Sequence, residues 1–253
     1  MPRNVNNPGY VIVFATVVSA VFTAGIMALH AVTEPVMIAN EQAFNRKALV
    51  EIFYPTLVEK FGLEPKATFT NAQVNEIYKQ HIRKRPGPDG NQLLVQDPQT
   101  GTEFAVYEAF GGEGAGERVV GYAFPISGVG FWNVIDGYLA VNKDRSRILG
   151  ITFTKHQETP GLGGRITEPA WRDRFEGLDI TPPVARDDPQ GSAEGTPAYI
   201  YIGKQPPPGG AGNDRFVETI TGATGTSTAV AKFLNDDIAQ FRRAADAANL
   251  PKE

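Results

Sequence analysis

Cysteine is absent from this chain of 253 residues, and histidine, methionine and tryptophan are scarce, with three, three and two residues. Without cysteine the chain itself forms no disulfide, holds no iron–sulfur cluster through thiolates and offers neither a thiol nucleophile nor a cysteinyl flavin. His81 and His156 have no ligand partner or paired acid nearby in the sequence. We therefore predict no metal site and no catalytic nucleophile–base pair.

An excess of positive charge is also missing. Lys and Arg number 24 against 28 Asp and Glu, a formal net charge of −4, and no arginine–aromatic cluster is present. Nucleic acid is therefore not an expected partner. A dinucleotide-binding fingerprint is missing too, because the glycines at 111, 112, 114 and 116 lack its spacing and its following helix. They predict a hairpin loop between two strands.

One long hydrophobic run stands near the start of the chain. Tyr10–Val32 carries no formal charge and exceeds the roughly 20 residues that span a bilayer. A cleaved signal peptide is the alternative, but its apolar core is usually about 7–15 residues and a small-residue cleavage site follows it. No such site follows here. We predict a single transmembrane helix over 10–32, with residues 1–9 cytoplasmic because Arg3 precedes the span, and the main domain outside the cytoplasm.

Helical spacing continues after the span. Glu34 and Pro35 are expected to close the span, Val36–Phe53 predicts a helix leaving the membrane, and Thr70–Arg83 predicts another helix. The segment 33–100 is therefore predicted to be a helical membrane-proximal region. Its basic cluster Arg83-Lys84-Arg85 is expected to be a solvated helix end, where positive charge suits the helix dipole.

Residues 101–253 turn to short runs typical of strands. The predicted strands are Phe104–Tyr107, Arg118–Ile126, Tyr138–Val141, Ile148–Phe153 and Tyr199–Ile202. The turn Asn142–Ser146 joins two of them and implies an antiparallel sheet, while the proline- and glycine-rich stretches 181–197 and 206–210 predict loops. We predict an α+β fold, an antiparallel sheet with flanking helices, for this domain.

An amphipathic helix is predicted after Ser227, on the spacing of apolar residues from Val230 to Phe241. Thr226 or Ser227 is expected to be its N-cap, since a hydroxyl there accepts a bond from an amide without a helical partner. The loop before it, from Thr221, combines hydroxyls and glycines at a helix N-terminus, an arrangement that suits a phosphate. An ordinary capped helix is the alternative that spacing alone leaves open.

The residues Thr221-Gly222-Ala223-Thr224 resemble a flavinylation motif. The family pattern is Asp-x-x-Ser/Thr-Gly-Ala-Thr, found in the C subunit of the sodium-translocating NADH:quinone reductase and in the G subunit of the related Rnf complex. The resemblance implies that a flavin transferase joins FMN to Thr224 through a phosphoester. Glu218 stands where the family usually has Asp, one methylene longer.

Two further segments resemble the same family. Residues 124–140 contain Gly130-Phe131-Trp132 and Gly137-Tyr138-Leu139-Ala140, similar to the Gly-Leu-Trp and Gly-Tyr-Leu-Ala of the quinone reductase C subunit. Residues 150–164 are similar to its Gly-Ile-Thr-Phe and His-x-Glu-Thr-Pro-Gly-Leu-Gly-Gly. The departures are Phe131 for Leu and Gln157 for Gly.

The resemblance implies a covalent-FMN electron carrier in the membrane complex that oxidises NADH, reduces ubiquinone and pumps sodium. Its partners would be the other subunits of that complex, the flavin transferase during maturation, and membrane lipid. The flavin would lie between the Thr224 loop and the loop 158–164, with His156 shaping the latter. The residues expected at the FMN are Thr221, Gly222, Ala223, Thr224, Thr226, Ser227, Glu158, Thr159, Leu162, Gly163 and Trp132.

Two alternatives remain at this point. The G subunit of the ferredoxin-linked Rnf complex shares Thr-Gly-Ala-Thr and Glu-Thr-Pro-Gly-Leu-Gly. From a different class, the chain is an unflavinylated, membrane-anchored interaction domain in which Thr224 merely precedes a helix.

Overall fold

The computed structural model describes residues 7–66, 68–87, 90–112, 118–182, 198–206 and 213–252. The chain forms two compact units, Met1–Phe44 and Asn45–Glu253. Most of the two expected loops at 181–197 and 206–210, and the glycines at 114 and 116, lie outside the described residues.

Helix α1, Pro8–Phe61, begins in the first unit and ends in the second. It is long and apolar enough to cross a membrane, and its apolar side chains between Tyr10 and Phe44 are exposed. The helix continues through Glu34 and Pro35, where the membrane span is expected to close, and into the helix expected over 36–53. A proline removes one backbone donor, and the surrounding helical hydrogen bonds outweigh that loss.

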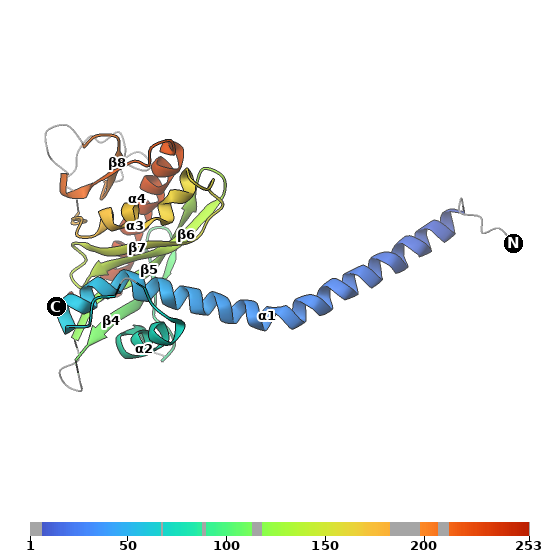
Figure 1. Ribbon diagram of the computed structural model, residues 1–253, viewed down its shortest axis with the longest axis horizontal. Helices are drawn as coiled ribbons and strands as arrows, with labels where there is room; N and C mark the ends of the chain where they lie inside the picture. Colours follow the sequence, from blue (N-terminus) through green and yellow to red (C-terminus); the bar gives the residue numbers. More distant parts are fainter. Residues whose placement is uncertain are drawn as a thin grey trace. The chain divides into compact units, whose positions relative to one another are not determined.

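The second unit is built on a five-stranded antiparallel sheet in the order β1-β4-β5-β6-β7 (Figure 1). Its strands are β1 (Ile82–Lys84), β4 (Tyr107–Gly111), β5 (Arg118–Val129), β6 (Val134–Asn142) and β7 (Ile148–Lys155). The short strands β2 (Leu94–Gln96) and β3 (Glu103–Ala105) form a separate antiparallel pair. The expected hairpin joined by the turn 142–146 is confirmed as β6 and β7.

The two faces of the sheet differ because successive side chains of a strand point to opposite sides. On β5, Tyr122 and Phe124 enter the larger core with helix α4 (Thr224–Ala247), while Ala123 between them faces the last turns of α1. Small residues line this second face, and a Cβ added to Gly150 would lie 2.8 Å from the backbone oxygen of Ile52. The helices therefore cover both faces of the sheet (Figure 1).

Helix α2, Asn71–His81, agrees with the helix expected over 70–83, and its N-cap Thr70 and Gln73 form a capping box. The basic cluster after it is not the solvated helix end that we expected. Arg83 Nε and Arg85 Nη1 donate to the two oxygens of buried Glu108 on β4, at 2.6 and 2.7 Å. Arg83 and Lys84 lie in strand β1 and Arg85 follows it, and one carboxylate distant in sequence accepts a charge-assisted hydrogen bond from each arginine.

The connection from β7 to α4 contains short elements. They are η2 (Gly163–Thr167), α3 (Pro169–Arg172), η3 (Asp173–Phe175), β8 (Tyr201–Gly203), η4 (Asn213–Arg215) and β9 (Phe216–Glu218), with β8 and β9 parallel. The strand expected from Tyr199 begins two residues later. The amides of Tyr199 and Ile200 donate instead to the buried side chain of Asn235 on α4.

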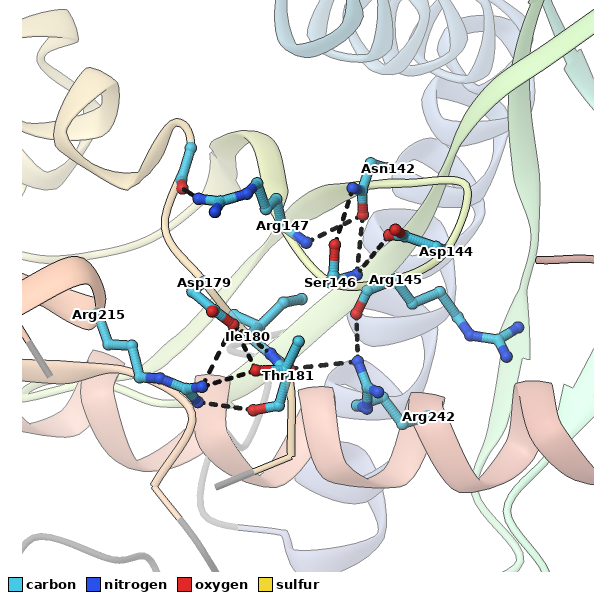
Figure 2. Close-up of polar contacts among 11 residues, drawn as sticks. Asn142, Asp144, Arg145, Ser146, Arg147, Asp179, Ile180, Thr181, Arg215 and Arg242 are labelled. Atoms are coloured by element: carbon cyan, nitrogen blue, oxygen red, sulfur yellow. Dashed lines mark hydrogen bonds and ion pairs between the residues drawn. The ribbon is translucent and has the colours of Figure 1, made fainter. Parts of the chain in front are cut away.

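Arg242 fastens the far end of the β6–β7 hairpin to α4, and Arg215 of η4 binds the segment 179–181 beside it (Figure 2). Arg242 of α4 donates to the carbonyl oxygens of Arg145 and Ile180. Arg215 donates to the side chains of Asp179 and Thr181, at 3.2 and 2.8 Å. This end of β6 is opposite the β5–β6 tip, so the network fixes α4 at a distance from the pocket described next.

Candidate functional site

A hollow of about 190 Å³ opens where three segments meet: the β5–β6 hairpin tip, the chain leaving β7 and the start of α4. Its lining residues are Phe131, Trp132, Glu158, Thr159, Leu162, Gly163, Gly222, Ala223, Gly225 and Thr226. The structure thus brings together most of the residues expected at the cofactor, from segments that lie far apart in the sequence.

The hairpin tip contributes two exposed aromatic rings. Pairing of β5 with β6 extends to Val129 and Val134, and Phe131 and Trp132 follow in the turn, 61% and 67% exposed. Trp132 Nε1 donates to the Thr159 hydroxyl at 3.1 Å, which fixes the indole beside the hollow. Rings held in place yet exposed are available to pack against a flat ligand.

The chain leaving β7 makes a tight turn. The amides of Leu162 and Gly164 both donate to the Thr159 carbonyl oxygen, and Gly161 has a φ of 74°, which favours glycine. The turn places Leu162, 46% exposed, at the rim of the hollow. His156 accepts a hydrogen bond from the Glu158 amide at 3.2 Å, in keeping with a loop-shaping role.

The Glu158 side chain points inward and is only 4% exposed. Oε1 accepts from the amides of Phe131 and Trp132 at 2.9 and 3.1 Å. Oε2 accepts from the Thr226 hydroxyl at 2.6 Å. One carboxylate therefore links all three segments of the pocket.

Helix α4 begins at Thr224, with Ala223 as an N-cap that makes no side-chain capping bond. The expected N-cap at Thr226 or Ser227 is wrong. The Ser227 hydroxyl is buried inside the first turn, where it donates to the Ala223 carbonyl oxygen and accepts from the Ile220 amide. Gly222, with a φ of 82°, makes the turn that precedes the helix.

Thr224 is exposed at the first residue of α4, between the pocket residues Ala223 and Gly225. Amides in the first turn of a helix lack helical acceptors and carry the positive end of the dipole, so the position favours an anion. Thr221 lies apart, in a second hollow of about 250 Å³ with Arg165, Arg174 and Glu218. Ser227 is fully buried.

Two pocket residues, Phe131 and Gly225, were missing from the expected site. A Cβ added to Gly225 would lie 2.7 Å from the Phe131 ring, so this glycine lets the aromatic ring close on the helix. The sequence contains both residues beside recognised motifs. It gives no sign that they meet, because their contact depends on the tertiary fold.

The described pocket fits FMN in its chemistry, with a helix N-terminus for a phosphate and apolar walls, Trp132 and Leu162, for a ring. Residues 130–239, which include the whole pocket lining, match the model of the FMN-binding domain family. This segment of the chain is similar to the FMN-binding domain family, and helix α1 before it is long and apolar enough to anchor the chain in a membrane.

Among named relatives it is similar to the C subunits of the Na(+)-translocating NADH-quinone reductase. The Yersinia pestis protein is 28% identical over 216 residues, which cover 83% of this chain and 72% of that protein. The protein from Neisseria meningitidis serogroup A is 34% identical over 153 residues, covering 60% of this chain and half of that protein.

A solved structure has the same fold. The crystal structure of Shewanella oneidensis NqrC superimposes with a TM-score of 0.54 at 17% identity, covering 81% of this chain and 98% of that chain. The predicted α+β fold, with one long apolar helix before it, is confirmed.

Proposed function

We propose that this chain is the FMN-carrying C subunit of a sodium-translocating NADH:quinone reductase, the complex that oxidises NADH, reduces ubiquinone and moves sodium out of the cell. The observation that carries the proposal is the exposed Thr224 at the first residue of α4, beside a pocket walled by Trp132 and Leu162. The named C-subunit relatives support it over the G subunit of the Rnf complex.

Thr224 carries the FMN through a phosphoester in this proposal. Its side chain is exposed, so a flavin transferase has access to it, whereas the Ser227 hydroxyl is buried and engaged in two hydrogen bonds. The amides of the first helical turn would face the phosphate. Glu218 stands where the flavinylation motif usually has Asp. Its side chain is exposed, and its Oε2 lies 3.2 Å from Arg174 Nη1.

The pocket is small for a whole flavin. Its volume of about 190 Å³ is below the roughly 300–1,000 Å³ of sites that enclose a drug-sized ligand. The flavin ring would therefore pack on Trp132 and Leu162 with an edge open to solvent. An open edge suits electron exchange with another protein.

The chain's own residues bind and orient the cofactor. Bound FMN would supply the electron-accepting and electron-donating chemistry, and the protein contributes position and electrostatics. The sequence has no nucleotide-binding fingerprint, so electrons must come from and pass to the other subunits. The domain boundaries suggested by the sequence, with a helix over 10–32 and an FMN-binding domain from 101, remain predictions.

The decisive test of the attachment residue is Thr224→Ala. The full-length chain, co-produced with a flavin transferase, should give a fluorescent flavin band on a denaturing gel. Thr224→Ala should abolish the band, because the acceptor hydroxyl is gone, while the neighbouring Thr226→Ala should keep it. A fluorescent Thr224→Ala chain would refute the attachment site. In the assembled complex, the Thr224→Ala variant should still oxidise NADH, because that step takes place in another subunit, and should lose quinone reduction and sodium pumping.

The proposed location is a bacterial inner membrane, with the N-terminus in the cytoplasm, a single span through lipid and the flavin domain in the periplasm. A reporter that is active only outside the cytoplasm, fused after Glu253, should be active. Carbonate washing should leave the chain in the membrane fraction. A reporter active only in the cytoplasm contradicts the orientation, and release by carbonate contradicts the anchor.

A further inference from the structure

Glu158 was expected to touch the cofactor, but its carboxylate is occupied by the protein itself. Both oxygens accept hydrogen bonds, from the amides of Phe131 and Trp132 and from the Thr226 hydroxyl, at 2.6 to 3.1 Å. The side chain still lines the pocket. It therefore lies directly beneath whatever the pocket holds.

Two glycines beside this carboxylate have no space for a side chain of their own. A Cβ added to Gly130 would lie 2.6 Å from Oε1, and one added to Gly163 would lie 2.7 Å from Oε2 and 2.5 Å from the Thr226 hydroxyl. Such close approach is possible only at glycine. Two glycines from different segments thus form a cradle around one carboxylate, and the cradle holds it in a single position.

The charge of Glu158 is solvated but not cancelled. Its three donors are neutral groups, two backbone amides and one hydroxyl. The first turn of α4, to which Thr226 belongs, adds only the partial positive charge of a helix N-terminus. In a buried position of low dielectric, a negative charge acts strongly on a neighbouring group.

We propose that Glu158 is the positioning residue that sets the reduction potential of the flavin: its fixed negative charge beneath the pocket opposes the addition of electrons to the ring. Thr226 tunes this effect by donating to the same carboxylate. The inference rests on the proposed function, that FMN occupies this pocket. Its direction follows from electrostatics, because reduction adds negative charge to the flavin and Glu158 repels it.

Two substitutions should move the potential in opposite directions. Glu158→Gln keeps the length and an acceptor oxygen for the two amides but removes the charge, so the midpoint potential should shift positive. Thr226→Val keeps the volume and the carboxylate but removes one donor, so the charge is less solvated and the potential should shift negative. Thr226→Ser keeps the hydroxyl, so its midpoint potential should equal that of the natural chain.

The measurement is a potentiometric titration of the full-length flavinylated chain in detergent, followed by flavin absorbance. Glu168→Gln is the matched control: Glu168 is about half exposed and pairs with Arg165 rather than lining this pocket, so its loss should leave the potential unchanged. In the Glu158→Gln background, Thr226→Val should produce a smaller shift than it does alone, because the two residues act on one charge.

The inference is supported if the midpoint potential shifts in opposite directions in Glu158→Gln and Thr226→Val and does not change in Glu168→Gln. Shifts of the same sign in Glu158→Gln and Thr226→Val would indicate a merely structural effect and overturn it. An unchanged potential in Glu158→Gln, or a folded Glu158→Gln chain that takes up no flavin, also overturns it while leaving the proposed function intact. If the natural chain itself carries no flavin, the proposed function fails and this inference fails with it.

Discussion

Asp237 on α4 should make the folded domain less stable as the pH rises from about 4 to about 7. The side chain is 9% exposed, and one oxygen accepts a hydrogen bond from the Ser127 amide at 2.9 Å. Burial raises the pKa of Asp237 from 3.8 to about 7; the Ser127 bond opposes this rise, and the charge of Asp236 adds to it. Asp136, which accepts from the Ser127 hydroxyl at 2.7 Å, is another acidic group nearby.

The sign and size follow from proton linkage. Between the two pKa values the folded chain keeps the proton and the unfolded chain releases it, so the free energy of unfolding falls as the pH rises. A rise of the pKa from 3.8 to about 7 corresponds to about 4 kcal/mol, at roughly 1.4 kcal/mol for each tenfold change in proton affinity. The side chain of Asp237→Asn carries no charge at any pH, so this variant should remove the decline and be more stable than the natural chain at pH 8 by about 4 kcal/mol.

The assay is urea unfolding of the full-length chain in detergent at pH 4.5, 6 and 8, followed by the fluorescence of buried Trp171. Exposed Asp214 provides the control, since Asp214→Asn should leave the pH dependence of the natural chain unchanged. If Asp237→Asn and the natural chain lose stability in parallel between pH 4.5 and 8, the assignment of this pH dependence to Asp237 is refuted.

Two further substitutions test the core and the pocket. Arg243 donates twice to buried Asp97 and lowers its pKa to about 2; Asp97→Asn should therefore cost about 2 kcal/mol at pH 7. This cost should shrink as the pH falls from 4 through 2, and a constant cost in urea unfolding would contradict it. Gly163→Ala should displace Thr226 and Glu158, because their oxygens lie 2.5 and 2.7 Å from the position of the new Cβ. This displacement should disturb the pocket, so Trp132 should quench the fluorescence of the flavin less. Gly164→Ala, where the nearest atom to the new Cβ is 3.2 Å away, should change the quenching less. Equal changes in the two variants would contradict the close packing of Gly163 against Glu158.

Local patterns in the sequence were enough for the elements. The uncharged run from Tyr10, the hairpin around Asn142 and the helix after Thr224 each depend on the periodicity or composition of neighbouring residues, which physical chemistry ties directly to backbone conformation. The motif residues near Thr224 and the loop 158–164 were likewise found in the sequence, because their order along the chain carries the resemblance. The antiparallel sheet and the α+β class were predictable too, because short strand-like runs and the turn after Asn142 are local patterns.

Only the tertiary structure decided what the polar side chains do. Glu158 turns inward because the amides of Phe131 and Trp132 arrive from another hairpin, and Arg83 joins a strand because Glu108 lies opposite it. A buried polar group is stable only when distant segments bring it hydrogen-bond partners. The sequence alone pointed to most of the residues near the proposed attachment residue Thr224, and long-range packing determined which of them line the pocket.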